Sequence, residues 1–179
     1  MLVTVGGTIA SGKTTLAKGI ADRFKFKHLS AGEIMRRLAK EHEMDITEFS
    51  KHAEGNPDID HKIDEMQREL VSRYLDEGYD VIIDGRLSAY FLDPDIKVWF
   101  YTPLDVGAER IMKRDGYGRE EAVEKIKLRE GSEKKRYKEL YNIDLDDLSV
   151  YDIVLNTGKW SIEGMTDVVA KAIEKYALK

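Results

Sequence analysis

The stretch GTIASGKT, residues 7–14, decides the fold of this chain because it matches the pattern G-x-x-x-x-G-K-[ST] at every fixed position. A glycine-rich loop of this kind turns successive backbone N–H groups toward the phosphates of a nucleotide. Lys13 is then placed to reach the β- and γ-phosphates, and the Thr14 hydroxyl can hold Mg²⁺. We therefore predict a nucleotide site along the loop, formed by Gly7, Thr8, Ile9, Ala10, Ser11, Gly12, Lys13, Thr14 and Thr15.

The residues on either side of this loop support the motif. Residues 2–5 (LVTV) form a short β-prone run that leads into it. After the loop, apolar residues recur at helical spacing, and the positive end of such a helix points at a bound phosphate. The alternative, a chance match within a structural glycine turn, does not explain this order of strand, loop and helix. The apolar residues of the predicted helix are Leu16, Ala17, Ile20, Ala21 and Phe24.

Length and composition limit the classes of protein that remain. A chain of 179 residues fits one domain and can bury a sizeable core. No apolar run reaches the ~18 residues of a membrane span and no leader is visible, so we expect a cytoplasmic protein without membrane partners. The absence of cysteine excludes disulfides, thiolate nucleophiles and cysteine zinc sites. A net charge of −5 argues against a nucleic-acid partner, and we expect a monomer that binds small molecules.

Predicted strands and helices alternate along the whole chain, which indicates an α/β fold with a parallel sheet between helices. Two regions read as insertions over the edge of the sheet, at about 31–75 and about 115–145. Five strands are predicted, at residues 2–5, 27–30, 81–83, 97–101 and 152–155. Beyond the loop, helical segments are predicted at about 32–43, 57–77, 103–115, 120–141 (one helix or two) and 162–176.

Two of these helices have recognisable starts. Asn56 is the expected N-cap of the helix that Pro57 opens, because asparagine caps helices and proline favours their first position. Thr102 and Asp105 fit a capping box of the S/T-x-x-D type for the next long helix. We expect the helix after Pro57 to bury one apolar face, made of Ile59, Ile63, Met66, Leu70, Tyr74 and Leu75.

Two strand ends carry further candidates for phosphate binding. Asp84 ends the third predicted strand, where ligands of open α/β sheets bind, and Gly85 and Arg86 follow it. The carboxylate can organise Mg²⁺ through water, and the guanidinium can hold a phosphate with two hydrogen bonds. Ser30 closes the second strand, and Arg36 lies in the first turns of the helix that follows. The alternative for both arginines is an ordinary solvent-exposed position.

Cationic side chains crowd residues 110–136. Most of them fit a solvated helix surface, but phosphoryl transfer depends on positioning and charge neutralisation, which a mobile lid with arginines supplies. Arg110 and Arg114 are spaced i,i+4, and Arg129 and Arg136 lie seven apart, so each pair can share a helix face. The catalytic candidates are therefore Lys13, Arg86, Arg110, Arg114, Arg129 and Arg136.

Several segments together resemble the nucleoside monophosphate kinases, and among them the archaeal-type cytidylate kinases. SAGEIMR (30–36) is similar to the entry of the monophosphate site, and FSKHAEGNPDIDHKID (49–64) to the acceptor-binding region. DGRL (84–87) is similar to their strand-end motif, and REGSEKKRYKELYNID (129–144) to their lid. The chain departs from the family at residues 8–10, where proline is common, but the backbone N–H groups that bind phosphate remain.

This resemblance implies a single kinase domain over residues 1–179, with a P-loop NTPase sheet in the order 2-3-1-4-5, an acceptor-binding insertion at 31–75 and a lid at 115–145. It implies phosphorylation of CMP and dCMP by ATP with Mg²⁺, which Thr14 and Asp84 would hold. For reading cytosine, Asp60, Asp64 and Glu133 are candidates against the simpler role of surface charge. The acceptor-binding candidates are Ser30, Gly32, Arg36, Asp60, Asp84, Gly85 and Arg86.

Other functions remain open at this point. An adenylate kinase or a shikimate-type small-molecule kinase would share the loop and the fold, and only a comparison of acceptors separates them. A nucleotide-operated switch with little turnover is a different class, but no N-K-x-D motif for guanine occurs in the sequence. A kinase of nucleic-acid 5′ ends is disfavoured by the negative net charge.

Overall fold

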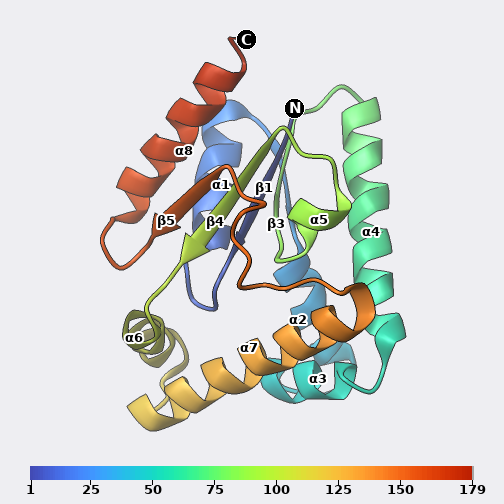
Figure 1. The fold of residues 1–179 in the computed structure, drawn as a ribbon, viewed down its shortest axis with the longest axis vertical. Helices are drawn as coiled ribbons and strands as arrows, with labels where there is room; N and C mark the ends of the chain where they lie inside the picture. Colours follow the sequence, from blue (N-terminus) through green and yellow to red (C-terminus); the bar gives the residue numbers. More distant parts are fainter. Residues whose placement is uncertain (179) are drawn as a thin grey trace.

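A five-stranded, fully parallel sheet forms the centre of the molecule in the computed structural model, which describes residues 1–178 (Figure 1). The strands follow the order β2-β3-β1-β4-β5, which the family resemblance implied. Their register places the carboxyl ends of β1, β3 and β2 at one edge, since Val5 pairs with Asp84 and Asp84 with Ser30. The strands are β1 (Leu2–Gly7), β2 (Lys27–Ser30), β3 (Val81–Asp84), β4 (Ile96–Tyr101) and β5 (Ile153–Asn156).

The two faces of the sheet are covered by different helices. Alternate residues of a strand point to opposite faces, so Val3 and Val5 pack against α1 (Lys13–Phe24) and α8 (Ile162–Tyr176). Leu2 and Val81 face the other way and pack against Val71 of α4 (Pro57–Asp76). Both faces are therefore buried, which explains why the central strands are continuous apolar runs.

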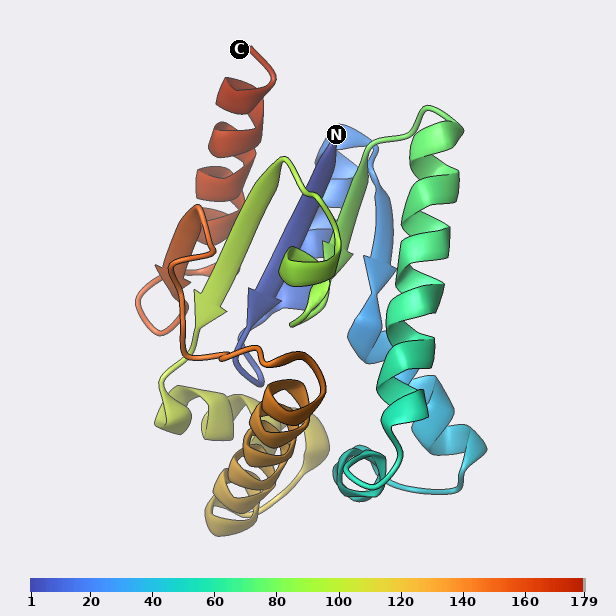
Figure 2. The same ribbon diagram turned by 45° about the vertical axis from the view of Figure 1, so that its right-hand side comes forward.

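The remaining helices gather beyond the carboxyl ends of the strands (Figures 1 and 2). They include α2 (Ala31–Glu41), α3 (Ile46–Ala53), α6 (Leu104–Asp115) and α7 (Arg119–Tyr141), while the short α5 (Ser88–Phe91) lies beside β1. The helix α7 is continuous, so residues 120–141 form one helix rather than two. No helix among residues 1–178 is long and apolar enough to cross a membrane.

The position of the cap before Pro57 is confirmed, but the side chains predicted to cap two helices bond other groups. Asn56 stands at the N-cap of α4, but its side chain donates to the carbonyl of His52 at 2.9 Å and makes no cap. The expected capping box at Thr102 is absent, since α6 begins after Pro103 and the Thr102 hydroxyl bonds Thr157 at 2.7 Å. The helix α3 was not predicted, although Asp45 opens it with a complete capping box.

The buried face of α4 is more polar than predicted. Ile63 is buried as expected, but Leu75 is exposed, and Asp60, Asp64 and Gln67 are buried instead. Charged side chains are rarely buried without partners, so this face must meet either charged groups or a ligand. It turns these three residues toward the cavity at the carboxyl ends of the strands.

Candidate functional site

The phosphate loop leads from β1 into α1, and its backbone is fixed on both sides. The N–H of Thr8 donates to the carbonyl of Phe100 at 3.0 Å, and Lys13 Nζ donates to the carbonyl of Thr8 at 3.2 Å. Gly12 has a φ of +83°, a left-handed conformation that favours glycine, and a Cβ here would also lie 2.9 Å from the tip of Ile162. The first N–H groups of α1 are thereby presented to a ligand without further rearrangement.

Lys13 lies in a strongly cationic neighbourhood. Burial of its ammonium group and repulsion from Arg86 lower the pKa of Lys13 to about 8, while Asp84 acts in the opposite direction. A bound polyphosphate would compensate this repulsion, because it adds negative charge next to the ammonium group. The protein alone does not balance the positive charge of Lys13, as expected of a lysine that binds an anion.

Asp84 is 1% exposed at the end of β3 and is surrounded by hydrogen-bonding groups. Its Oδ1 accepts from the hydroxyls of Thr14 and Ser30, each at 3.0 Å, and its Oδ2 lies 2.8 Å from His28 Nε2. A hydroxyl and a carboxylate oxygen beside a phosphate loop are the hard ligands that Mg²⁺ takes together with substrate phosphates. The donor set at Thr14 and Asp84 therefore fits the predicted ion.

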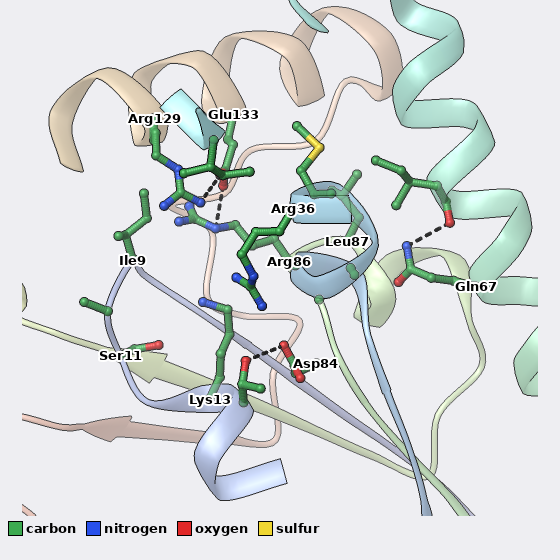
Figure 3. A pocket seen from close by; sticks show the side chains of 18 of the residues that line it. Ile9, Ser11, Lys13, Arg36, Gln67, Asp84, Arg86, Leu87, Arg129 and Glu133 are labelled. Atoms are coloured by element: carbon green, nitrogen blue, oxygen red, sulfur yellow. Dashed lines mark hydrogen bonds and ion pairs between the residues drawn. The ribbon is translucent and has the colours of Figure 1, made fainter. Parts of the chain in front are cut away.

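An arginine cluster closes the cavity above Lys13. Arg36 comes from α2, Arg86 follows β3, and Arg129 descends from α7 (Figure 3). Glu133 of α7 joins two of them, with its Oε2 2.6 Å from Arg86 Nε and its Oε1 3.8 Å from Arg129 Nη2. Glu133 is thus shared between two arginines, and Arg36 adds a third cation to the cavity.

The charges in this cluster are not balanced by the protein. Burial opposes ionisation of Glu133, but the surrounding cations, Arg86 and Arg129 foremost, together hold the pKa of this carboxyl below its usual value. Burial lowers the pKa of the Arg129 guanidinium, and its Nε is buried without a hydrogen-bond partner among the described residues. A buried donor without a partner is costly, and a phosphate oxygen would satisfy it.

Glu130 links α7 to the phosphate loop. Its Oε1 accepts a hydrogen bond from the N–H of Ile9 at 2.9 Å and lies 3.8 Å from Arg86 Nη2. Residue 9 belongs to the segment where the chain departs from the family, and a proline there would have no N–H to donate. The N–H that Ile9 retains in place of a proline is therefore used in a hydrogen bond to α7.

The far end of the cavity is formed by α4. Gln67 lies on the opposite side of the cavity from Ile9 and Ser11 (Figure 3). Asp60 is held by Arg136, whose Nε donates to its Oδ2 at 2.9 Å. Gly85 is packed tightly here, since a Cβ would collide with the Ser88 hydroxyl and lie 3.1 Å from Gln67 Oε1. This end is therefore a crowded, polar pocket rather than an open groove.

The structure brings most of the predicted site residues into this one cavity of about 230 Å³. Six cationic and four anionic side chains line it, which leaves an excess of positive charge suited to phosphates. From the predicted loop, the lining includes Ile9, Ala10, Ser11, Gly12, Lys13, Thr14 and Thr15. From the acceptor and catalytic candidates, it includes Gly32, Arg36, Asp60, Asp84, Gly85, Arg86, Arg114, Arg129 and Arg136.

Four predicted residues do not line this cavity. Gly7 and Thr8, at the start of the loop, are absent from the lining, and Ser30 hydrogen-bonds Asp84 and the N–H of Glu33. Arg110 links the loop to the residue after β5. Its Nη1 donates to the carbonyl of Ala10 at 2.9 Å, and its Nη2 donates to the carbonyl of Thr157 at 2.8 Å. Its predicted contact with the γ-phosphate stays a prediction.

Two further candidates have partners that the sequence did not suggest. Arg114 lines the cavity but pairs with Asp115, with its Nε and Nη2 each 2.7 Å from the carboxylate. Glu133 is a buried partner of Arg86 and Arg129. It is therefore not a surface charge, and its carboxylate is already paired within the protein. Their catalytic or binding roles stay predictions.

Sequence reasoning missed several residues of the site. Gln67 and Tyr137 line the cavity, His28 contacts Asp84, and Glu130 contacts the loop. A signal for Gln67 was available, because residues 60, 64 and 67 share one helix face and interrupt the apolar pattern of α4. No local pattern marks the other three, whose contacts cross between distant elements.

The fold and the cavity define a P-loop nucleotide-binding protein. The model of the cytidylate kinase-like family matches residues 2–159, and the chain belongs to this family. It is 48% identical over 179 residues to the cytidylate kinase of Methanocaldococcus jannaschii, covering 97% of this chain and 98% of the relative. It is 46% identical over 185 residues to the cytidylate kinase of Methanopyrus kandleri, covering 97% and 93%.

Solved structures with lower sequence identity share the fold alone. An uncharacterized protein from Eubacterium ventriosum is 21% identical with a TM-score of 0.73, covering 97% of this chain and 98% of that one. Shikimate kinase from Acinetobacter baumannii, in complex with shikimate, is 18% identical with a TM-score of 0.63, covering 99% and 95%. These likenesses confirm the predicted sheet order and the helical layers around it.

Proposed function

We propose that this chain is a cytidylate kinase that transfers the γ-phosphoryl group of ATP to CMP, and also to dCMP. Its family and its archaeal relatives support the reaction and the use of ATP. The observation that carries the proposal is the single cavity in which the phosphate loop faces Arg36, Arg86 and Arg129. Two phosphate groups must meet in such a kinase, and this cavity offers cations from three separate elements to hold them.

The geometry suggests how the two nucleotides are held. The loop and Lys13 bind the β- and γ-phosphates of ATP, and Arg36 and Arg86 bind the phosphate of CMP. Arg129, with the other predicted lid arginines Arg110, Arg114 and Arg136, neutralises charge as the phosphoryl group moves. These arginine assignments remain proposals, and the present contacts of Arg110 and Arg136 would have to change for a direct phosphate contact.

The transfer needs no side chain as a general base. An oxygen of the CMP phosphate attacks the γ-phosphorus in line, and the bond to the β–γ bridging oxygen breaks. ADP leaves with that oxygen, and CDP forms. The attacking oxygen is already ionised at neutral pH, so the protein contributes positioning, charge neutralisation and exclusion of water.

We propose that Thr14 and Asp84 hold Mg²⁺, with Asp84 acting through water. When bound, the ion would neutralise charge on the β- and γ-phosphates. His28 and Ser30 keep the Asp84 carboxylate oriented toward this position. A cytoplasmic location and a monomeric state also stay predictions.

A coupled assay of ADP release tests the proposal against its alternatives. The purified protein would be given ATP and Mg²⁺ with CMP, dCMP, UMP, AMP, GMP or shikimate in parallel. Turnover confined to CMP and dCMP is the expected result. Turnover with only AMP or shikimate would replace the substrate assignment, and slow hydrolysis without any acceptor would indicate a switch.

Replacing Lys13 by alanine tests the role of the loop. We expect kcat to fall by about 10²–10³-fold, because a charge aimed at the transferring phosphate is lost. Lys18→Ala is the matched control, since Lys18 is an exposed lysine of the same helix, paired with Glu33. A Lys13→Ala variant with the rate of the unmodified protein would overturn the mechanism.

A further inference from the structure

The three carboxylates considered for reading cytosine have different partners. Glu133 pairs with Arg86 and Arg129, and Asp60 pairs with Arg136. Asp64 lines the same cavity, is 8% exposed, and forms no ion pair with any residue from 1 to 178. It is therefore the one of the three that no residue of the described part of the protein holds in an ion pair.

Hydrogen bonds fix the position of the Asp64 carboxylate. Tyr141 Oη donates to Oδ2 at 2.8 Å, and the amide of Gln67 lies 3.5 Å from Oδ1. The Ser88 hydroxyl donates to Gln67 Oε1 at 3.0 Å, which turns the Gln67 amide nitrogen toward Asp64 and the carbonyl of Ile63. Oδ1 has only this long contact, so it keeps the capacity to accept from a ligand.

The position of Asp64 suits the base of the acceptor rather than its phosphate. Asp64 follows Asp60 by one helical turn, and both lie on the face of α4 that carries Gln67. Gln67 lies across the cavity from the phosphate loop, beyond Arg36 and Arg86 (Figure 3). A nucleotide whose phosphate binds these arginines would extend its base toward this polar end.

We propose that Asp64 determines the base specificity of the acceptor site by accepting a hydrogen bond from the 4-amino group of cytosine. This inference rests on the proposed function. A carboxylate is a hydrogen-bond acceptor only, so it matches the amino group of cytosine and opposes the O4 acceptor of uracil. The residue would thus separate CMP and dCMP from UMP.

The electrostatic state of Asp64 agrees with this role. Burial raises the pKa of Asp64 to about 6, a rise to which Asp60 contributes and which the hydrogen bond from Tyr141 opposes. The groups around it also include His61 and Arg68, each of which favours the charged form. Asp64 is therefore mostly ionised at neutral pH although its burial disfavours the charge, and a hydrogen bond donated by a ligand would stabilise the charged form.

The test compares kcat/KM for CMP and UMP in the unmodified protein and in Asp64→Asn. Asparagine can turn its amide nitrogen toward O4 of uracil, so we expect the ratio of CMP to UMP to fall by about 10- to 100-fold. Glu65→Gln is the matched control, an exposed neighbour on the same helix, and should leave the ratio unchanged. A ratio that changes less than twofold in a folded Asp64→Asn protein would overturn the proposal.

A second measurement does not depend on the folding of the variant. The unmodified protein is assayed with the monophosphate of 2-pyrimidinone ribonucleoside, in which hydrogen replaces the 4-amino group of cytosine. We expect kcat/KM to be at least about 10-fold below that for CMP, and equal values would refute the role of Asp64. Absence of CMP phosphorylation in the unmodified protein would instead refute the proposed function, so the two failures are distinguishable.

Discussion

Replacing Arg136 by methionine should destabilise the protein strongly. Methionine keeps the apolar stem but removes the guanidinium of a side chain that is 2% exposed. The group donates to Asp60 Oδ2 at 2.9 Å, to the carbonyl of Ser50 at 2.6 Å and to Ser132 Oγ at 2.9 Å. Ser50 keeps a hydrogen bond from Ser132 in the variant, but Asp60 loses its cation.

The expected loss in the free energy of unfolding is about 3–5 kcal/mol at neutral pH. This is the typical cost of breaking a buried ion pair, because the remaining carboxylate is buried and uncompensated. Burial already raises the pKa of Asp60 and Arg136 opposes this, so the variant should raise that pKa further. The loss should therefore shrink as the pH falls and Asp60 takes up a proton.

Urea unfolding followed by circular dichroism at two pH values measures these changes. The double variant Arg136→Met with Asp60→Asn removes both charges and should recover most of the lost stability. Lys138→Met, an exposed residue of α7, serves as the control. A loss below about 1 kcal/mol in Arg136→Met, or no recovery in the double variant, would refute the reasoning. The rate of a stable double variant then tests the separate prediction that Arg136 reaches the phosphates.

Two further predictions concern stability near the base end of the cavity. A folded-state pKa raised from 3.8 to about 6 means that ionised Asp64 disfavours folding above pH 6. Asp64→Asn should therefore stabilise the free protein by about 1–3 kcal/mol at pH 7.5, and the gain should vanish below about pH 4; a gain independent of pH would contradict this cause. Gly85→Ala should cost about 1–3 kcal/mol, because its Cβ would collide with the Ser88 hydroxyl. The control Gly131→Ala, with open space in α7, should not destabilise, and equal effects of the two alanines would show that the crowding at Gly85 is unimportant.

The sheet and the loop could be predicted because their signals are local. Central strands with both faces buried read as apolar runs, and Gly12 and Lys13 occupy fixed positions of a motif. The parallel register then brings Ser30 and Asp84 to the same edge as the loop. Residues placed at strand ends were therefore found without knowledge of the packing.

The partners of the charged residues could not be predicted because they come from elements distant in sequence. Arg110 and Arg136 share helix faces with other arginines, but their contacts depend on how α6 and α7 pack. Asp60 and Glu133 read as surface charges in the sequence, whereas the structure buries both against arginines. Local spacing specifies a helix face but does not specify what that face meets.

The contacts of α7 have a consequence for how the two nucleotides influence each other. Two residues of this helix that lie six positions apart make these contacts: Glu130 contacts the loop where ATP is proposed to bind, and Arg136 contacts Asp60 on the proposed acceptor side. Both contacts come from one continuous helix, so a displacement of α7 at one contact would shift the other. With the two nucleotides bound as proposed, such a movement would couple the affinities for donor and acceptor, and by thermodynamic reciprocity each nucleotide would change the binding of the other by the same factor.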